Sequence, residues 1–106
     1  MTTIKELTIK VNEVIDDYRE RYPEVKLEGK DYLPFKISEE WGECIKAFLM
    51  ATDRGRQKGL TKEEISKNLS DEMADVFAYI LAFAQQENID LEKALEAKWF
   101  QYLKQK

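Results

Sequence analysis

Apolar residues recur along the chain at alternating spacings of three and four, which is the period of an amphipathic helix. The pattern is clear over residues 3–22, and it predicts a helix that ends at Pro23, because proline cannot continue a helix. The apolar seam of this helix consists of Ile4, Leu7, Val11, Val14 and Tyr18. Residues 23–35 contain two prolines and a glycine and show no period, so we expect a loop there.

Three further segments have the helical period and complete the prediction of secondary structure. They are residues 36 to about 53, residues 61 to about 87, and residues 91–105. Nothing in the chain alternates between apolar and polar residues over four or more positions, as a half-buried strand would. Four helices joined by short turns predict an all-α, bundle-like fold.

Local end signals support the boundaries of the later helices. Thr61 and Glu64 have the spacing of a capping box, in which each side chain bonds the backbone N–H of the other residue. Asn88 is expected to end the third helix, and Asp90 to cap the fourth. The sequence around residues 68–70 suggests an irregularity within the third helix.

The second and third helices carry two copies of one pattern, at residues 37–49 and 69–81. In each copy an apolar residue is followed by Ser, two acids, two variable residues, a third acid and an apolar run. Two acids therefore stand three residues apart in both copies, and residues at this spacing are neighbours on a helix surface. The four acids are Glu40, Glu43, Glu72 and Asp75.

The apolar stripes of these two helices predict how they pack. One stripe consists of Ile37, Trp41, Cys44, Ile45, Phe48 and Thr52, and the other of Leu69, Met73, Val76, Phe77, Ile80, Phe83 and Ala84. At roughly 100° per residue, both acid pairs lie on the same shoulder of their stripes. Antiparallel packing through the stripes would bring the shoulders together. Trp41 and Cys44 are then core residues, and Met73 fills gaps between the helices.

Four carboxylates in one place repel each other, and a divalent cation relieves that repulsion. The chain has no histidine and a single cysteine, so the ligands are oxygens, which favours Mg²⁺ or its substitute Mn²⁺. The alternative is an ordinary solvated helix face. Neither copy has Lys or Arg four residues after one of these acids, as a surface rich in ion pairs often would.

Composition narrows the class of protein. A length of 106 residues predicts one domain over residues 1–106, small enough that oligomerisation would usefully bury more surface. A net charge of −4 argues against sequence-independent binding to nucleic acid. The chain has no apolar run of membrane-spanning length and one cysteine, so we expect a soluble, cytoplasmic protein without an intrachain disulfide.

At the acidic motifs the sequence resembles the MazG-like all-α nucleoside triphosphate pyrophosphohydrolases. That family's signature is Glu-Glu-x-x-Glu on one helix and Glu-x-x-Asp on the next, which residues 39–43 and 72–75 match. Gly42, the apolar run with Tyr79 after the second motif, and residues 89–94 also agree. The resemblance spans about residues 35–99.

The resemblance implies a reaction and a set of roles. Members hydrolyse a nucleoside triphosphate with Mg²⁺ to the monophosphate and pyrophosphate, and they assemble as homodimers or homotetramers. The implied metal ligands are Glu40, Glu43, Glu72 and Asp75. Glu39 is implied as an additional catalytic acid, which holds a second metal or positions the attacking water. The implied substrate-binding residues are Lys36, Tyr79 and Lys98.

The chain departs from the family at its C-terminal end. Where the family often has Asn and Arg after the last-helix lysine, this sequence has Tyr102 and Gln105. Phosphate contacts from Arg54, Arg56, Lys58 or another subunit are the alternatives. A different class of function also stays open, namely a non-catalytic helical interaction module whose acids bind a structural metal or a basic partner.

Overall fold

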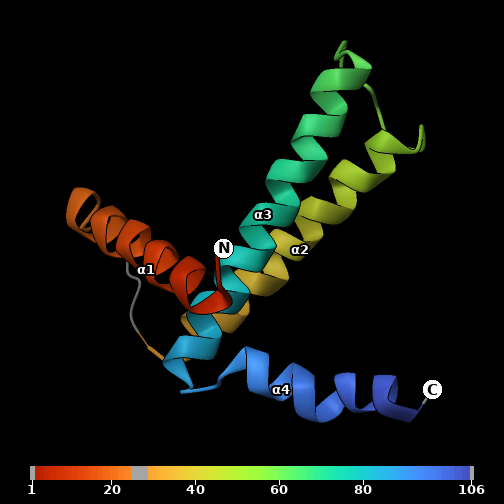
Figure 1. Cartoon of the computed structure of the whole chain (residues 1–106). Helices are drawn as coiled ribbons and strands as arrows, with labels where there is room; N and C mark the ends of the chain where they lie inside the picture. Colours follow the sequence, from red (N-terminus) through yellow and green to blue (C-terminus); the bar gives the residue numbers. More distant parts are fainter. Residues whose placement is uncertain (1, 25–28, 106) are drawn as a thin grey trace. The chain divides into compact units, whose positions relative to one another are not determined.

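The computed structural model describes residues 2–24 and 29–105, and every regular element within them is helical (Figure 1). The elements are α1 (Ile4–Arg21), α2 (Tyr32–Ala51), α3 (Lys62–Gln86), α4 (Leu91–Lys98) and a 3₁₀ helix, η1 (Phe100–Gln105). The prediction of an all-α fold is confirmed. No helix in these two ranges combines the length and the apolar character needed to cross a membrane.

The start of α2 differs from the prediction. Tyr32 to Phe35 were expected in a loop, yet α2 begins at Tyr32. Pro34 is the third residue of the helix, and backbone N–H groups in the first turn have no intrahelical partner, so its missing N–H costs nothing there. Residues 25–28 of the predicted loop lie outside the described part of the chain.

The predicted helix ends are confirmed by their hydrogen bonds. Glu64 N donates to Thr61 Oγ1 over 3.1 Å while Thr61 N donates to Glu64 Oε1 over 2.9 Å, which completes the capping box. Lys93 N donates to the Asp90 side chain over 3.1 Å. Asn88 adopts a left-handed φ of 56° just after α3, where asparagine is tolerated.

Two details of the later helices were predicted wrongly. α3 runs unbroken from Lys62 to Gln86, so there is no irregularity at residues 68–70. The last segment is not one α-helix, because α4 ends at Lys98 and residues 100–105 form η1. Short 3₁₀ turns commonly follow the C-terminal end of an α-helix.

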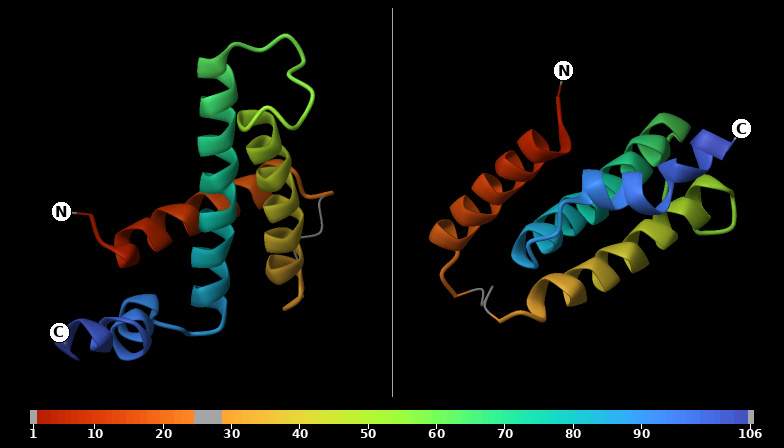
Figure 2. Two further views of the ribbon diagram at one scale, coloured as in Figure 1. Left: turned by 90° about the vertical axis from the view of Figure 1, so that its right-hand side faces the viewer. Right: turned by 60° about the horizontal axis from the view of Figure 1, so that its bottom comes forward.

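The chain divides into two compact units, and α3 contributes to both of them. The α2–α3 unit comprises residues 31–80, and the remainder comprises residues up to 30 and from 81 onwards. Within the α2–α3 unit the two helices lie side by side and run in opposite directions (Figure 2). Its buried apolar side chains are Leu33, Cys44, Ala47 and Ile65. That the whole chain is one domain stays a prediction.

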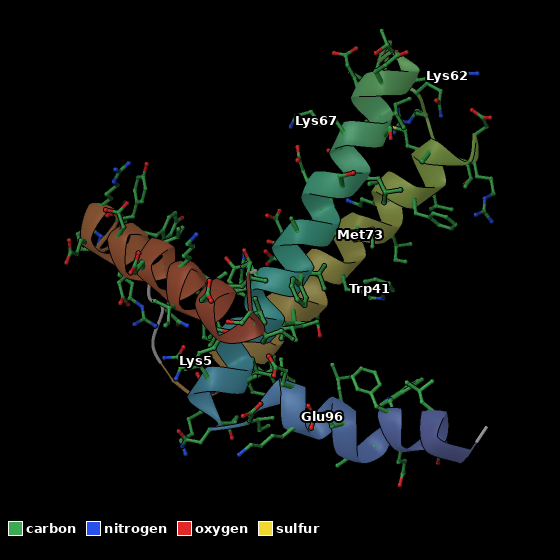
Figure 3. The ribbon with its side chains drawn as sticks, in the orientation of Figure 1. Lys5, Trp41, Lys62, Lys67, Met73 and Glu96 are labelled. Carbon is green, nitrogen blue, oxygen red and sulfur yellow. The ribbon has the colours of Figure 1, made fainter. Side chains whose placement is uncertain are left out.

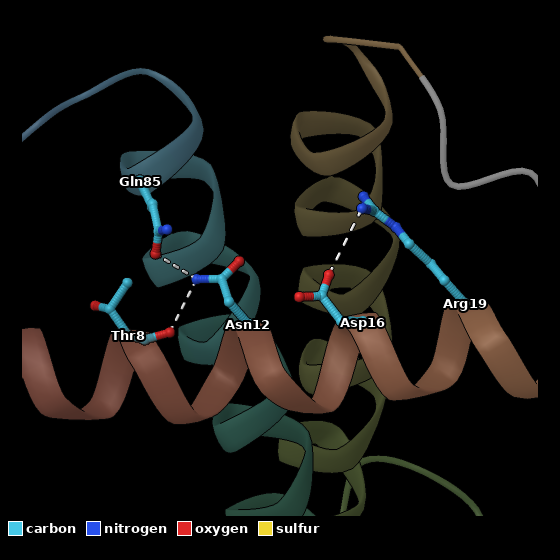
Figure 4. Close-up of polar contacts among 5 residues, drawn as sticks. All are labelled: Thr8, Asn12, Asp16, Arg19 and Gln85. Atoms are coloured by element: carbon cyan, nitrogen blue, oxygen red, sulfur yellow. Dashed lines mark hydrogen bonds and ion pairs between the residues drawn. The ribbon is translucent and has the colours of Figure 1, made fainter.

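The other unit contains α1, the end of α3, α4 and η1. Asn12 Nδ2 on α1 donates to Gln85 Oε1 over 2.5 Å and to Thr8 O over 2.9 Å (Figure 4). The buried side chains of this unit, Leu81, Ala82 and Ala84, all belong to α3. Neither α1 nor α4 has a buried residue.

The faces through which α2 and α3 pair are rotated from the predicted stripes. Cys44 is a core residue, as expected, with 4 % exposed. Trp41 is 54 % exposed and Met73 is 57 % exposed, so their predicted places in the core are wrong. The buried line on α2 passes through Leu33, Cys44 and Ala47, and the half-buried Glu40 belongs to the same face. The acids therefore lie closer to the helix pairing than a shoulder position implied.

Candidate metal centre

Three of the four predicted ligands come together between α2 and α3. Glu40, Glu72 and Asp75 each have a carboxylate oxygen, and these three oxygens lie within 4.8 Å of one another. Among the described residues this is the one group of three or more such side chains with metal-binding proximity. Both copies of the repeated pattern contribute to it, Glu40 from α2 and the other two from α3.

The fourth predicted ligand, Glu43, lies outside this group. Its side chain is half-exposed, and Lys46 Nζ lies 3.7 Å from its Oε1. It still affects the site at longer range, because its negative charge is among the causes that raise the pKa of Glu72. The structure thus gives three converging carboxylates with a fourth negative charge nearby.

Lys36 lies against the acids of α2, one turn before them. Its Nζ is 2.7 Å from Glu39 Oε1 and 3.2 Å from Glu40 Oε1. The side chain is mostly covered, and the ammonium also lies 5.6 Å from the centroid of the Tyr79 ring. Partial burial lowers the pKa of Lys36, but its hydrogen bonds with Glu39 and Glu40 outweigh this and raise it. Lys36 is therefore a fixed positive charge beside the cluster.

The electrostatics of the cluster show the expected crowding of negative charge. Burial raises the pKa of Glu72, and the charges of Asp75 and Glu40 raise it further. Burial also raises the pKa of Tyr79, and Lys36 opposes that shift. Tyr79 consequently keeps its phenolic proton at neutral pH and can donate a hydrogen bond beside the carboxylates.

Two ion pairs made by the predicted ligands Glu40 and Glu43 were not anticipated from the sequence. Lys or Arg was sought four residues after each acid, whereas Lys36 stands four residues before Glu40 and Lys46 three residues after Glu43. Both spacings bring side chains together on a helix, so a search in both directions would have found them. The observation weakens the contrast drawn between this cluster and a surface rich in ion pairs.

Lys98 is the exposed last residue of α4 and belongs to the other unit of the chain. Glu39, by contrast, lies on α2 next to the cluster, and its carboxylate is held by Lys36. The structure therefore brings together Lys36, Glu39 and Tyr79 with the three carboxylates. Of these six residues Glu39 and Asp75 are exposed, and the other four are half-buried.

Comparisons with models of known protein families, with curated protein sequences and with solved structures found no match.

Proposed function

We propose that this chain is a Mg²⁺-dependent nucleoside triphosphate pyrophosphohydrolase that resembles the MazG-like enzymes, with a role in nucleotide-pool housecleaning. The observation that carries the proposal is the meeting of Glu40, Glu72 and Asp75 from the two copies of the acidic pattern. A fold that needed these acids only for solubility would gain nothing from crowding them on a helix-pairing face, where their repulsion is strongest.

The donor set fits a hard divalent cation. All three converging ligands are carboxylate oxygens, and Glu43 is placed to add a fourth negative charge. Mg²⁺ binds through carboxylates together with substrate phosphates, and Mn²⁺ accepts the same ligands. A bound ion would supply charge neutralisation on the triphosphate and a lowered pKa of water. Burial, followed by the charges of Asp75 and Glu40, raises the pKa of Glu72, and a bound divalent cation would oppose that shift.

The side chains around the cluster have roles that follow from their placement. Lys36 supplies a positive charge that can pair with a phosphate oxygen, as it now pairs with Glu39 and Glu40. The Tyr79 hydroxyl can donate to a phosphate oxygen. Glu39 is the exposed carboxylate next to the site, and it accepts the proton of the water whose oxygen attacks the α-phosphorus. The α–β bridging bond breaks, and pyrophosphate leaves.

The proposal extends to the assembly of the chain. In a MazG-like arrangement the antiparallel α2–α3 pair is the centre of a four-helix bundle that oligomerisation completes, as a homodimer or homotetramer. The uncovered apolar residues of α1 and α4 are compatible with contacts to other subunits. Lys98, on α4, is proposed to contact a substrate phosphate in the assembled bundle.

The test is a panel of canonical and modified nucleoside triphosphates incubated with the protein and Mg²⁺, with monophosphate and pyrophosphate as the measured products. We expect stoichiometric formation of both from at least one member of the panel. In Glu72→Gln we expect turnover to fall by about 100-fold or more, because a neutral amide replaces an anionic ligand.

Asp71→Asn is the matched control. Asp71 precedes Glu72 on α3 and is exposed, and its Oδ2 lies 2.7 Å from Lys67 Nζ. Its charge is the smallest of the named causes that raise the pKa of Glu72, and it does not belong to the converging oxygens. Its loss should change turnover by less than about threefold. If Glu72→Gln hydrolyses as fast as the parent, the site assignment fails. If no triphosphate is cleaved while Mg²⁺ still binds, the non-catalytic interaction module becomes the better description.

A further inference from the structure

The converging carboxylates lie on one side of the α2–α3 pair, which we call the acidic side, and this side continues past them in both directions. With roughly 100° between successive residues of a helix, the residues that share this side can be placed. Towards the start of α2 they are Tyr32, Phe35, Lys36 and, on α3, Tyr79, and in the other direction they include Lys46 and Lys67. All of these residues belong to the α2–α3 unit.

The end of the acidic side at the start of α2 is aromatic. Tyr32, Phe35 and Lys36 stand at positions i, i+3 and i+4, a spacing that puts them on one face. This face exists because α2 begins at Tyr32, where the sequence predicted a loop. Burial raises the pKa of Tyr79, and the nearby Tyr32 phenol adds to that rise, so Tyr32 and Tyr79 are neighbours. Phe35 is the exposed aromatic residue here and offers a ring face for stacking.

The opposite end of the acidic side is basic, and within α2 and α3 it has no aromatic residue. Lys46 and Lys67 each lie about six residues, or about 9 Å, along their helix from the converging carboxylates. Because the helices are antiparallel, the two lysines stand at about the same level of the pair. Each side chain is 76 % exposed and lies beside a single acid, Glu43 or Asp71, and Lys67 projects from α3 away from α2 (Figure 3). Such ammonium groups can exchange a carboxylate for a more highly charged phosphate group.

The difference between the two ends does not come from the repeated pattern. Aligning residues 37–49 with residues 69–81, and extending the alignment slightly upstream, equates Phe35 with Lys67 and Lys46 with Ala78. The acids in the middle therefore repeat, whereas the residues at the ends do not. A site for a symmetric anion needs no such difference. Like halves with unlike ends suit an elongated ligand that is aromatic at one end and anionic at the other.

We propose that a nucleoside triphosphate lies along the acidic side with its base stacked on Phe35, its α-phosphate beside Lys36, and its β- and γ-phosphates beside Lys46 and Lys67. The inference rests on the proposed hydrolysis, and it adds the orientation of the substrate and the residues that recognise each end. Stacking uses the ring face that every base has, so Phe35 accepts purines and pyrimidines alike.

The position of Glu39 agrees with this orientation. Lys36 Nζ lies 2.7 Å from Glu39 Oε1 and draws that carboxylate towards the aromatic end. In-line displacement requires the attacking water and the leaving group to stand on opposite sides of the α-phosphorus. The water oxygen bonds to phosphorus from the Glu39 side, and Glu39 takes the proton. The bond to the α–β bridging oxygen breaks, and pyrophosphate leaves with the electron pair towards Lys46 and Lys67.

The aromatic end is tested with ribose 5-triphosphate, which has the phosphates of a nucleoside triphosphate and no base. In the parent its KM should be about tenfold higher than that of the nucleoside triphosphate that is cleaved best. Phe35→Ala should raise the KM of the nucleoside triphosphate about tenfold and change that of ribose 5-triphosphate by less than about twofold, because the abasic compound has nothing to stack. Phe35→Trp should restore the parent KM, since it keeps a ring face.

Phe48→Ala is the matched control for Phe35→Ala. Phe48 is an exposed phenylalanine of the same helix that lies outside the acidic side, so its loss should change neither KM. Circular dichroism of both variants should show the helix content of the parent. A KM change in Phe35→Ala that is equal for the two substrates, or absent from both, would show that the base is not stacked on Phe35.

Inhibition by the two products tests the orientation from both ends. Lys67→Met should raise the inhibition constant of pyrophosphate about fivefold and that of the nucleoside monophosphate by less than about twofold. Phe35→Ala should have the reverse effect. Lys62→Met makes the same change at the exposed first residue of α3, outside the acidic side, and should alter neither constant.

The outcomes separate the orientation from the reaction. If a nucleoside triphosphate is hydrolysed but Lys67→Met weakens both products equally, or Phe35→Ala weakens pyrophosphate instead of the monophosphate, the orientation is wrong and the proposed hydrolysis stands. If no triphosphate is hydrolysed, the orientation fails together with the proposed function.

Discussion

The two sides of the α2–α3 pair are built from the same repeat but have opposite chemistry. On one side Glu40, Glu72 and Asp75 concentrate negative charge, and on the other Trp41 and Met73 expose apolar surface. Glu40 and Trp41 are consecutive in the first copy, as are Glu72 and Met73 in the second. The roughly 100° step of the helix is enough to send such neighbours to different sides.

The comparison explains why the acids can converge at all. A helix whose whole apolar stripe faced its partner would leave the acids at the rim in water. Here the pairing face is shared between small buried residues such as Cys44 and Ala47 and the acids themselves. The large apolar residues are thereby rotated by roughly 100° from the pairing face onto an outer side of the pair. Crowded carboxylates and uncovered aromatic residues are two consequences of one helix rotation.

The largest effect is expected from a substitution that disrupts the packing of α2 against α3. Ala47 is 2 % exposed, so Ala47→Asp buries an unpaired charge there. We expect it to lower the free energy of unfolding by about 3 kcal/mol or more, measured by urea denaturation. Cation binding should be lost as well, since its ligands come from both helices of this pair.

Ala74→Asp is the control for that change. Ala74 is an exposed residue in the middle of α3, so the same substitution meets water there. Its cost should stay below about 1 kcal/mol, mostly from helix propensity. Similar losses in the two variants would mean that α2 does not pack against α3 through Ala47.

Comparing the acidic side with and without metal across pH sharpens the contrast further. The pKa of Glu72 is raised in the folded chain, so without metal its contribution to stability is lost as pH rises and returns as pH falls. A cation needs the ionised carboxylate, so Mg²⁺ stabilisation behaves in the opposite way. At 100 times its dissociation constant Mg²⁺ should add about 2.7 kcal/mol at neutral pH. As the pH falls, this gain should begin to decline while the pH is still above the ordinary pKa of glutamate, because the pKa of Glu72 is raised.

Thermal unfolding with and without Mg²⁺ between pH 5 and 8 measures both trends. Glu72→Gln should lack them, because the amide does not titrate, while Asp71→Asn should retain them. Trp41→Glu changes an exposed residue outside the converging oxygens and should keep the Mg²⁺ response. A Mg²⁺ gain that is constant across this range in the parent would count against Glu72 as a ligand.

The sequence was sufficient for features that short-range chemistry determines. Thr61 with Glu64 and Asp90 with the N–H of Lys93 are contacts within three residues, so the helix ends could be read directly. Periodicity also sufficed for the all-α fold. The meeting of Glu40 with Glu72 and Asp75 agrees with the predicted antiparallel pairing, although Glu43, the equivalent of Asp75, does not join them.

Helix rotation and exposure could not be read in the same way. The apolar pattern of a helix gives one stripe even when the helix has two apolar surfaces, because the periodicity averages over both. Trp41 and Met73 were therefore placed in the core although they are exposed. The apolar period of a single helix does not show which of its surfaces a neighbouring helix covers.

The smallest predicted effect concerns the positive charge within the acidic side. Lys36 Nζ lies 3.2 Å from Glu40 Oε1, where it competes with any divalent cation for that carboxylate. Lys36→Met should therefore tighten Mg²⁺ binding without nucleotide by about fivefold, while lowering stability without metal by less than about 1 kcal/mol. Lys46→Met makes the same change beside Glu43, outside the converging oxygens, and should alter Mg²⁺ affinity by less than about twofold. Calorimetric titration of Mg²⁺ into both variants decides the matter, because weaker binding in Lys36→Met would show that the lysine organises the carboxylates instead of competing for them.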